Sequence, residues 1–200
     1  MGAEIDLARR LLAGDASAFD DFVRVFRGKV YQYSYLMCGQ REDAEEIAQE
    51  TLMKVFQNFK QLREPEHVKA WIFRIAKNAC TMRRRKSTYA PSEEISLDQL
   101  RPSWNSDGEA RRLEIADWSA LPDQRAISTE MAGILRQSIR ELPDIYRSVL
   151  LLRDMEELST AETASILDVT EDVVKTRLHR ARLAVRQRLD EHLRSVEAAV

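Results

Sequence analysis

Apolar residues recur at helical spacing along most of the chain. Before residue 60 they fall three or four positions apart in three successive segments, residues 4–13, 15–40 and 41–59. Gly14 separates the first two segments, and Asp15 is expected to cap the second helix. Apolar stripes of this kind bury against neighbouring helices, so the pattern predicts three packed helices. The expected core positions are Phe19, Phe22, Val23, Phe26, Val30 and Tyr33 in the second segment and Ala44, Ile47, Ala48, Leu52, Val55 and Phe59 in the third.

A fourth helix is predicted after a polar connection that runs from Gln61 to Lys69. Pro65 in this connection is expected to end the third helix and to let the fourth begin. The opposite face of the fourth helix is polar and basic, and the helix finishes in a basic run. Such a face either follows a nucleic-acid backbone or complements the negative end of the helix dipole, and the sequence leaves both readings open. The apolar positions are Val68, Ile72, Ile75, Ala76 and Ala79, and the polar ones are Arg74, Lys77, Asn78, Thr81, Arg83, Arg84, Arg85 and Lys86.

The helical pattern fades between the first four segments and the last part of the chain. Residues 89–128 are rich in acids and are interrupted by Pro91, Pro102, Gly108 and Pro122. This composition is typical of a flexible linker. The chain is therefore expected to be all-α, with one small helical domain at residues 1–88, an acidic linker at 89–128 and a second small domain at 129–200.

Helical spacing returns in the second domain. One helix is predicted over residues 129–141, and Pro143 is well suited to be the first residue of the next. The bend at residues 156–158 is expected to end that second helix. Their inward positions are Met131, Ile134, Leu135 and Ile139, followed by Ile145, Val149, Leu152 and Met155.

The stretch from Ser159 to Arg188 carries the signals of a helix-turn-helix. Ser159 and Glu162 have the spacing of a capping box, and Thr170 precedes two acids at the start of a second helix. We predict two short helices joined by a tight turn, with Ala164 where they cross. The positions that hold them together are Leu167, Val169, Val174 and Leu178.

The second helix of this unit is basic along its length, with no acid between Lys175 and Arg188. A helix of this kind neutralises phosphates and reaches base edges in the major groove of DNA. The alternative is an ordinary basic surface helix, but the caps and small residues ahead of it favour DNA binding. The basic positions are Lys175, Arg177, Arg180, Arg182, Arg186 and Arg188.

Charge and composition exclude several other functions. The formal net charge of −2 hides a segregation of acids at residues 42–50 and 93–130 from bases at 83–86 and near the C-terminus. Cys38 and Cys80 lie far apart in the sequence with no resolving partner nearby, and the three histidines form no ligand cluster, so neither a disulfide nor a metal site is indicated. No phosphate loop or nucleophile elbow is present, so we expect neither an enzyme nor a cofactor. No membrane span or signal peptide is indicated, so a cytoplasmic protein is expected.

Two groups of motifs resemble one protein family. Residues 43–50 and 71–78 resemble the first domain of bacterial sigma factors of the extracytoplasmic-function (ECF) type, and Leu142, Pro143, Arg147 and residues 174–182 resemble their second domain. The resemblance implies a region 2-like four-helix domain and a region 4-like helix-turn-helix domain. It also implies a sigma factor that binds RNA polymerase core, directs it to promoter DNA and helps to melt the duplex. The alternative function is a stand-alone helix-turn-helix transcriptional regulator, which would not bind core polymerase.

The resemblance also implies roles for particular residues. An acidic and amide strip on the third helix would dock on the coiled coil of the polymerase's largest subunit, although the pattern alone also fits a solvated face. An anti-sigma protein that covers polymerase-binding surfaces is expected as a further partner. The residues expected to bind polymerase are Asp43, Glu46, Gln49 and Glu50; those for the upstream promoter element are Lys175, Thr176, Arg177, His179, Arg180 and Arg182; those for the downstream element are Arg63, His67, Arg74, Lys77, Asn78, Arg84 and Arg85.

Three positions depart from the family pattern. Asp168 and Asp172 stand where glycine is usual, and Met82 stands where aspartate is common. Because Asp tolerates left-handed backbone, Asp168 is expected to preserve the turn. Asp172 adds negative charge near DNA, and Met82 is expected to be a core residue.

Overall fold

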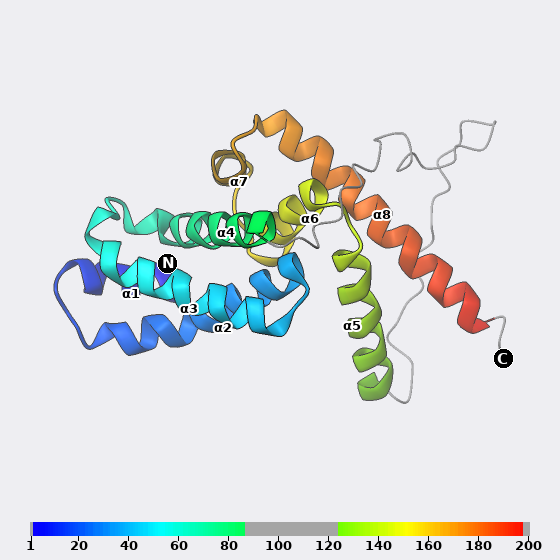
Figure 1. Cartoon of the computed structure of the whole chain (residues 1–200), viewed down its shortest axis with the longest axis horizontal. Coiled ribbons are helices and arrows are strands. Elements are labelled where there is room, and N and C mark those ends of the chain that lie inside the picture. Colours follow the sequence, from blue (N-terminus) through cyan, green and yellow to red (C-terminus); the bar gives the residue numbers. More distant parts are fainter. Residues whose placement is uncertain (1, 87–123, 198–200) are drawn as a thin grey trace.

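The computed structural model describes residues 2–86 and 124–197, which form helices and turns with no strand among them. The all-α prediction is therefore confirmed for this part of the chain. The expected linker lies mostly outside the described residues. The N-terminal helices are α1 (Ala3–Leu12), α2 (Ala18–Cys38), α3 (Arg41–Asn58) and α4 (Val68–Lys86), and the later ones are α5 (Gln124–Arg140), α6 (Asp144–Leu150), α7 (Thr160–Leu167) and α8 (Glu171–Glu197) (Figure 1).

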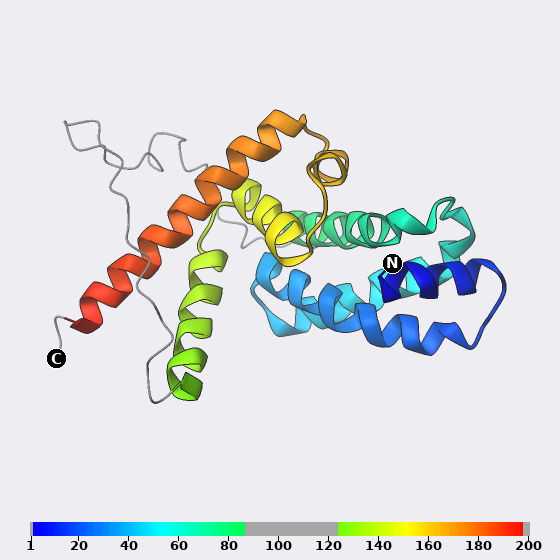
Figure 2. The ribbon, with the colours of Figure 1, turned by 180° about the vertical axis from the view of Figure 1, so that it is seen from behind.

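The core of the N-terminal helices is built where α2, α3 and α4 pack together, while α1 lies beside α2 on the side turned toward the viewer in Figure 2. Phe22 and Phe26 of α2 are fully buried, with ring centroids 4.7 Å apart. Tyr33 meets the edge of Phe73 from α4 at 5.4 Å. Because removing a buried aromatic ring costs about 3–5 kcal/mol, each of these rings contributes substantially to the stability of this part. Of the predicted stripe on α2, Phe19 and Val23 are only half-buried.

The connections between these helices differ in two details from the prediction. The backbone N–H of Ser17 donates to Oδ1 of Asp15, so Asp15 stabilises the turn before α2 rather than capping the helix itself. Helix α3 ends at Asn58, well before Pro65, so the prediction that Pro65 ends it is wrong. Two short 3₁₀ turns, Phe59–Gln61 and Pro65–His67, fill the gap, and Pro65 begins the second of them because its fixed φ suits the first position of a helical turn.

In the second half, α6 and α7 pack against α8, and α5 packs against the later part of α8. Helix α6 passes into a five-residue π-helical segment, Leu151–Met155, and the bend that follows has Glu157 at φ 55°. The prediction of two short helices in the helix-turn-helix is wrong for the second, since α8 is 27 residues long. Apolar residues continue on one side of α8 beyond the motif, which keeps the helix against α5.

Three predicted core positions are exposed. Leu135 of α5 is 41% exposed, and Ile145 is 44% exposed because α6 turns Tyr146 into the core instead. Met82 is 55% exposed near the end of α4, so its prediction as a core residue is also wrong. At each of these positions the buried face of the helix is offset from the one that the sequence pattern favours.

The two groups of helices pack against each other. Helix α7 packs across α4, and the N-terminal end of α6 and the C-terminal end of α5 meet the end of α2 (Figure 1). Arg147 donates to the carbonyl oxygen of Met37 at 2.9 Å, and Arg140 donates to that of Gly39 at 2.9 Å. Asp144 pairs with Arg84 of α4. These contacts, between Met37, Gly39 and Arg84 on one side and Arg140, Asp144 and Arg147 on the other, are called the domain seam below.

Candidate polymerase and promoter interfaces

The helix-turn-helix forms as its capping residues predict. The N–H of Glu162 donates to Oγ of Ser159 at 3.1 Å, and the N–H of Ser159 donates to the Glu162 carboxylate at 2.9 Å, which completes the capping box. Asp168 ends α7 with φ 56°, so it adopts the left-handed conformation expected of it. Thr170 then accepts from the N–H of Val173 at 3.4 Å and starts α8.

Helix α8 presents a polar face opposite the core. Val174, Leu178 and Ala181 are buried, while four of the residues expected to bind the upstream element are exposed. These four are Lys175, Thr176, His179 and Arg180. Their exposure leaves their donors accessible to base edges.

The other two residues of that set have different surroundings. Arg177 is half-buried and lines a pocket at the domain seam. Arg182 makes a two-pronged contact with Asp154, at 2.9 and 2.6 Å, which raises the pKa of its guanidinium. Asp172 is exposed and pairs with Lys175 at 3.1 Å. Asp172, which stands where the family usually has glycine, thus partly neutralises Lys175, a candidate for contacts to base edges.

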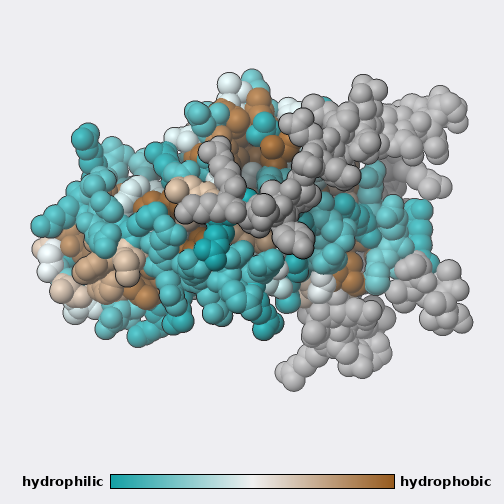
Figure 3. All heavy atoms as spheres, in the orientation of Figure 1, coloured by the Kyte–Doolittle hydropathy of each residue, from teal (hydrophilic) through white to brown (hydrophobic). Residues whose placement is uncertain are grey.

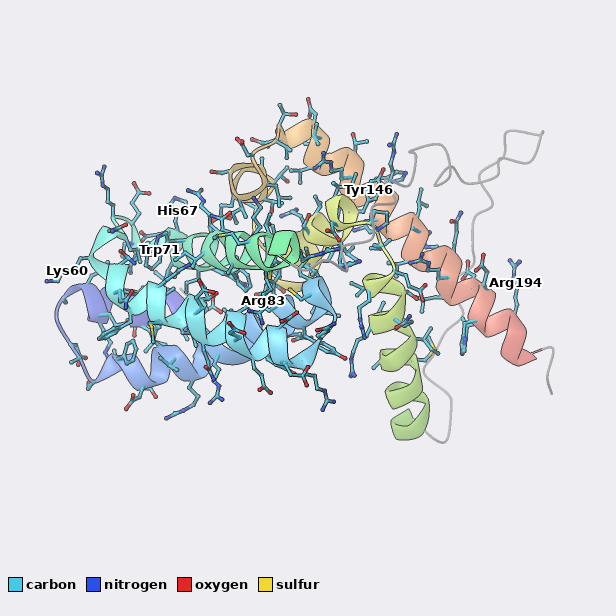
Figure 4. All side chains as sticks on the ribbon, in the orientation of Figure 1. Lys60, His67, Trp71, Arg83, Tyr146 and Arg194 are labelled. Atoms are coloured by element: carbon cyan, nitrogen blue, oxygen red, sulfur yellow. The ribbon has the colours of Figure 1, made fainter. Side chains whose placement is uncertain are left out.

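The candidate residues for the downstream element surround the start of α4. A pocket of about 470 Å³ is lined by the loop before α4, by the first turns of α4 and by α7. Arg63 and His67 come from the loop, while Trp71 and Arg74 come from α4. Figure 4 labels His67 and Trp71. Trp71 is half-buried and meets the edge of Phe59, so it contributes to both core and pocket.

Helix α7 occupies one side of this pocket. Arg74 donates to Oγ of Ser165 at 2.7 Å, and Nδ1 of His67 lies 3.3 Å from Oε1 of Glu162. These contacts join the two candidate DNA-binding regions directly. The sequence offered no signal for them, because they depend on how the two halves pack.

The remaining downstream candidates lie farther along α4. Asn78 is exposed, and Lys77 is half-buried at the seam pocket. Arg84 is paired with Asp144 of the second half. Arg85 belongs to α4, but its side chain lies outside the described residues.

The acidic strip of α3 is partly neutralised from within the chain. Arg83 of α4 donates to Asp43 at 2.8 Å and to Glu46 at 2.9 Å, which raises the pKa of the guanidinium. Glu50 pairs with Lys54 at 2.6 Å. Figure 4 shows Arg83 lying toward α3. The strip is thus a mixed surface of carboxylates, an amide and two cations.

A groove of about 640 Å³ runs between α2 and α3 beside this strip. Val23 and Tyr31 line one wall, and Ala48, Gln49 and Leu52 line the other. Hydrophilic side chains cover much of the face of the N-terminal helices in Figure 3, beside a smaller hydrophobic patch at the left end. The groove combines an apolar floor with charged edges, a combination that suits a helical protein partner.

Two titratable features were missed by sequence reasoning. Glu156 is 4% exposed, and burial raises its pKa to about 7 although Lys69 lies 3.9 Å away. The Cys80 thiol lowers the pKa of Cys38, and Cys38 together with burial raises the pKa of Cys80. The cysteines are 42 positions apart in the sequence, and only the packing of α2 on α4 brings them together.

Within residues 2–86 and 124–197, no group of three His, Cys, Asp or Glu side chains is arranged to hold a metal ion. None of the helices in the same ranges has the length and apolar content that a membrane span requires.

Comparison with known proteins gives one consistent result. The Sigma-70 region 2 family matches residues 22–89, and the Sigma-70, region 4 family matches residues 132–185. The ECF RNA polymerase sigma factor SigW of Bacillus subtilis is 32% identical over 90% of this chain and 94% of its own length. The RNA polymerase sigma-H factor of Pseudomonas aeruginosa is 26% identical over 94% of each chain.

A solved structure shares the fold. The sigma factor RpoE of Bartonella quintana, determined in complex with the anti-sigma factor NepR, superposes with a TM-score of 0.57 at 20% identity. The match covers 86% of this chain and 96% of that one. Both predicted domains thus match the same family in the same order, as the sequence resemblance implied. The chain therefore belongs to the ECF family of RNA polymerase sigma factors, which bind core polymerase and direct it to promoters without catalysing a reaction.

Proposed function

We propose that the exposed face of α8 reads the upstream promoter element. The observation that carries this assignment is the helix-turn-helix itself, whose second helix keeps Lys175, Thr176, His179 and Arg180 out of the core. Thr176, His179 and Arg180 offer hydrogen-bonding groups for base edges, and Arg177 and Arg182 are assigned to phosphates. Arg182 must then exchange Asp154 for a phosphate.

The downstream element is assigned to the pocket at the start of α4. Single-stranded DNA is bound by basic grooves that also offer a stacking surface or a pocket for an extruded base. Arg63, His67 and Arg74 supply the polar groups here, and Trp71 supplies an aromatic edge. Lys77, Asn78, Arg84 and Arg85 continue the basic face along α4.

In the described structure, helix α7 covers one side of this pocket and blocks access of DNA from that side. This helix belongs to the upstream-reading unit and binds both Arg74 and His67. Promoter binding therefore requires α7 to move away from α4. We assign the described arrangement to a closed state of the sigma factor and the promoter-bound one to an open state.

Polymerase docking is assigned to the α3 strip and the adjoining α2–α3 groove. Asp43, Glu46, Gln49 and Glu50 form a polar edge, and Leu52 adds apolar surface inside the groove. A basic helical partner would complement the carboxylates of the strip. Arg83 would remain with Asp43 and Glu46 and fix the position of these two carboxylates.

An anti-sigma protein is proposed as the regulator. The RpoE relative was captured with such a partner. For this chain we propose an inhibitor that covers the α3 strip together with residues 134–152 of the second half. The site of action is the cytoplasm, where polymerase and promoter DNA are found.

The test is transcription in vitro with purified core polymerase. Core plus this chain should initiate at discrete start sites on promoter-containing DNA, and core alone should not. A stand-alone regulator would instead bind DNA without core and would leave core unable to start at those sites. Mapping the start sites then defines the promoter elements needed for the residue-level tests.

A further inference from the structure

A pocket at the domain seam collects positive charge from both halves of the chain. Its volume is about 390 Å³, within the range of sites that take small molecules. Lys77 and Arg84 reach it from α4, and Arg177 reaches it from α8. Asp144 is the single acid among the residues that line it. The pocket therefore holds three cations against one carboxylate.

The carboxylate of Asp144 is already shared between two arginines. It pairs with Arg84, and its Oδ1 lies 3.7 Å from the guanidinium of Arg147 at the seam. The side chains of Lys77 and Arg177 make no ion pair or hydrogen bond with another residue of 2–86 or 124–197. Both side chains are half-buried, so salt screens their charges less than it would on an open surface. An anion that enters the pocket therefore meets two uncompensated cations.

The seam around the pocket is positively charged as well. Arg140 and Arg147 donate hydrogen bonds to backbone carbonyl groups at the end of α2, which carry no net charge. Burial lowers the pKa of the Arg147 guanidinium, and the charges of Arg84 and Arg140 act in the same direction, while Asp144 opposes them. A negative charge beside Arg84 would offset the repulsion among these arginines.

The remaining walls of the pocket offer a hydroxyl group and apolar surface. Ser148 of α6 brings the hydroxyl group, and Met37, Ile145 and Leu167 are apolar. Hydroxyl groups donate hydrogen bonds to phosphate oxygens, and an apolar wall accommodates the carbon portion of a small molecule. This lining suits a phosphorylated small molecule and does not suit a metal cation.

We propose that the seam pocket binds a small molecule that carries a phosphate or diphosphate group. The phosphate oxygens accept hydrogen bonds from Lys77, Arg84 and Arg177, which are charge-assisted and therefore stronger than bonds between neutral groups. The carbon portion of the ligand lies against the apolar wall. No catalytic step is involved, and the ligand leaves unchanged.

Such a ligand favours the closed state of the sigma factor. Arg177 and Lys77 face one pocket only while the two halves are packed together, so separation of the halves dismantles the site. A ligand that binds one of two states shifts the equilibrium toward that state, by about 100-fold at 100 times its dissociation constant. This consequence rests on the closed and open states and on the DNA-binding roles of Lys77 and Arg177 proposed above, whereas binding itself does not.

The first experiment uses the full-length protein without core polymerase or DNA. Titration calorimetry with sodium pyrophosphate at constant ionic strength should give one site per chain, and inorganic phosphate should bind more weakly because it carries less charge. Arg177→Gln and Lys77→Gln should each weaken pyrophosphate binding about 10-fold or more, because each removes a charge-assisted hydrogen bond. Circular dichroism checks that both variants keep the helical fold.

Arg194→Gln is the matched control. It removes the same charge from an exposed position near the far end of α8 (Figure 4), and it should bind pyrophosphate as the wild type does. Equal affinities of Arg177→Gln, Lys77→Gln and Arg194→Gln would overturn the site. Several weak sites in place of one would overturn it as well, because they would mark general attraction to basic surface.

The second experiment tests the effect on the closed state. The distance between spectroscopic labels at Gln61 and Ala161, which line one pocket between the two halves, is followed while core polymerase is added. Pyrophosphate should raise the core concentration needed for half-opening in the wild type and in Arg194→Gln, and should not raise it in Arg177→Gln. Pyrophosphate that binds without raising this concentration would overturn the link to the closed state. Failure of the proposed function would appear separately, as absence of specific initiation in the transcription assay without pyrophosphate.

Discussion

Arg180 and Arg182 lie two positions apart on α8 and differ in what they already bind. Arg180 is exposed, whereas Arg182 is held by Asp154. We expect Arg180→Ala to weaken binding of the holoenzyme to the cognate upstream element by about 1–3 kcal/mol, because a bidentate base contact is lost. Arg182→Ala should cost less and act alike on cognate and scrambled DNA, since it removes a phosphate contact. Competition binding with both duplexes measures the difference, and equal losses for Arg180→Ala would mark it as a backbone contact.

Glu156 makes stability depend on pH. Its pKa is raised to about 7 from 4.5, mainly by burial, with Glu4 and Glu157 adding to the shift and Lys69 and Lys29 opposing it. The folded state therefore holds a proton that the unfolded state releases, so the free energy of unfolding should fall as pH rises from 4.5 to about 7. The whole effect amounts to about 3 kcal/mol.

Chemical denaturation at several pH values measures this slope. Glu156→Gln should flatten it, and the exposed Glu191 of α8, which does not contribute to the shift, provides the matched control as Glu191→Gln. If the wild type and Glu156→Gln lose stability in parallel over this range, another group controls the pH dependence.

Residues that act through local backbone were the easiest to predict. Ser159, Glu162 and Thr170 accept hydrogen bonds from backbone N–H groups at the start of a helix, and Asp168 ends one. These contacts lie within a few positions of each residue, so their roles are visible in the sequence. Ile145 and Met82 were misjudged because one residue of rotation decides which side of a helix is buried. The effect of Cys38 and Cys80 on each other's pKa was missed because the two residues lie on helices that are distant along the chain.

At the level of elements, the α3 strip is tested by charge reversal. Glu46→Lys combined with Glu50→Lys should weaken binding to core polymerase by about 10-fold or more, because the partner surface is expected to be basic. The first of these substitutions also replaces the carboxylate that Arg83 binds with a second cation, so circular dichroism must show an intact helical fold.

The matched control for the strip is the pair Asp6→Lys and Glu66→Lys, which makes the same charge change on exposed positions of α1 and of the turn before α4. Core binding by the control should stay near that of the wild type. Unchanged binding by the α3 variant would identify the strip as a solvated face.

Helix α4 is tested at the melting step. Alanine at Lys77 and Asn78 should slow open-complex formation on duplex promoters about 10-fold or more, because these side chains are assigned to the displaced strand. A premelted bubble should partly rescue Asn78→Ala and should not rescue Arg180→Ala. Absence of rescue at Asn78 would assign it to folding or to duplex contacts.

The elements themselves were well predicted where apolar periodicity was long. Helices α1 to α4 lie within a few residues of the expected segments, since each carries a continuous buried stripe. The length of α8 was not predicted, because the helix-turn-helix motif defines only its beginning. The π-helical segment after α6 has no distinct sequence signal and was missed as well.

At the level of the whole molecule, the packing of the two halves against each other could not be predicted from the sequence. Arg147 was noted as part of a family motif, yet its contact with Met37 depends on a surface formed by the end of α2. The same packing brings α7 to His67 and Arg74. Individual site residues were therefore predictable, whereas the contact between the two promoter-reading regions was not.

The central claim is that the sigma factor is closed when free and opens on core polymerase. The most direct measurement is the distance between labels at Gln61 and Ala161, which line the same pocket from opposite halves, introduced as non-natural amino acids so that the native thiols stay intact. The free protein should give one short distance, and core polymerase should shift it to a longer one. Arg140→Ala with Arg147→Ala, which removes seam contacts, should populate the longer distance without polymerase. A distance that is the same with and without core polymerase would contradict the account.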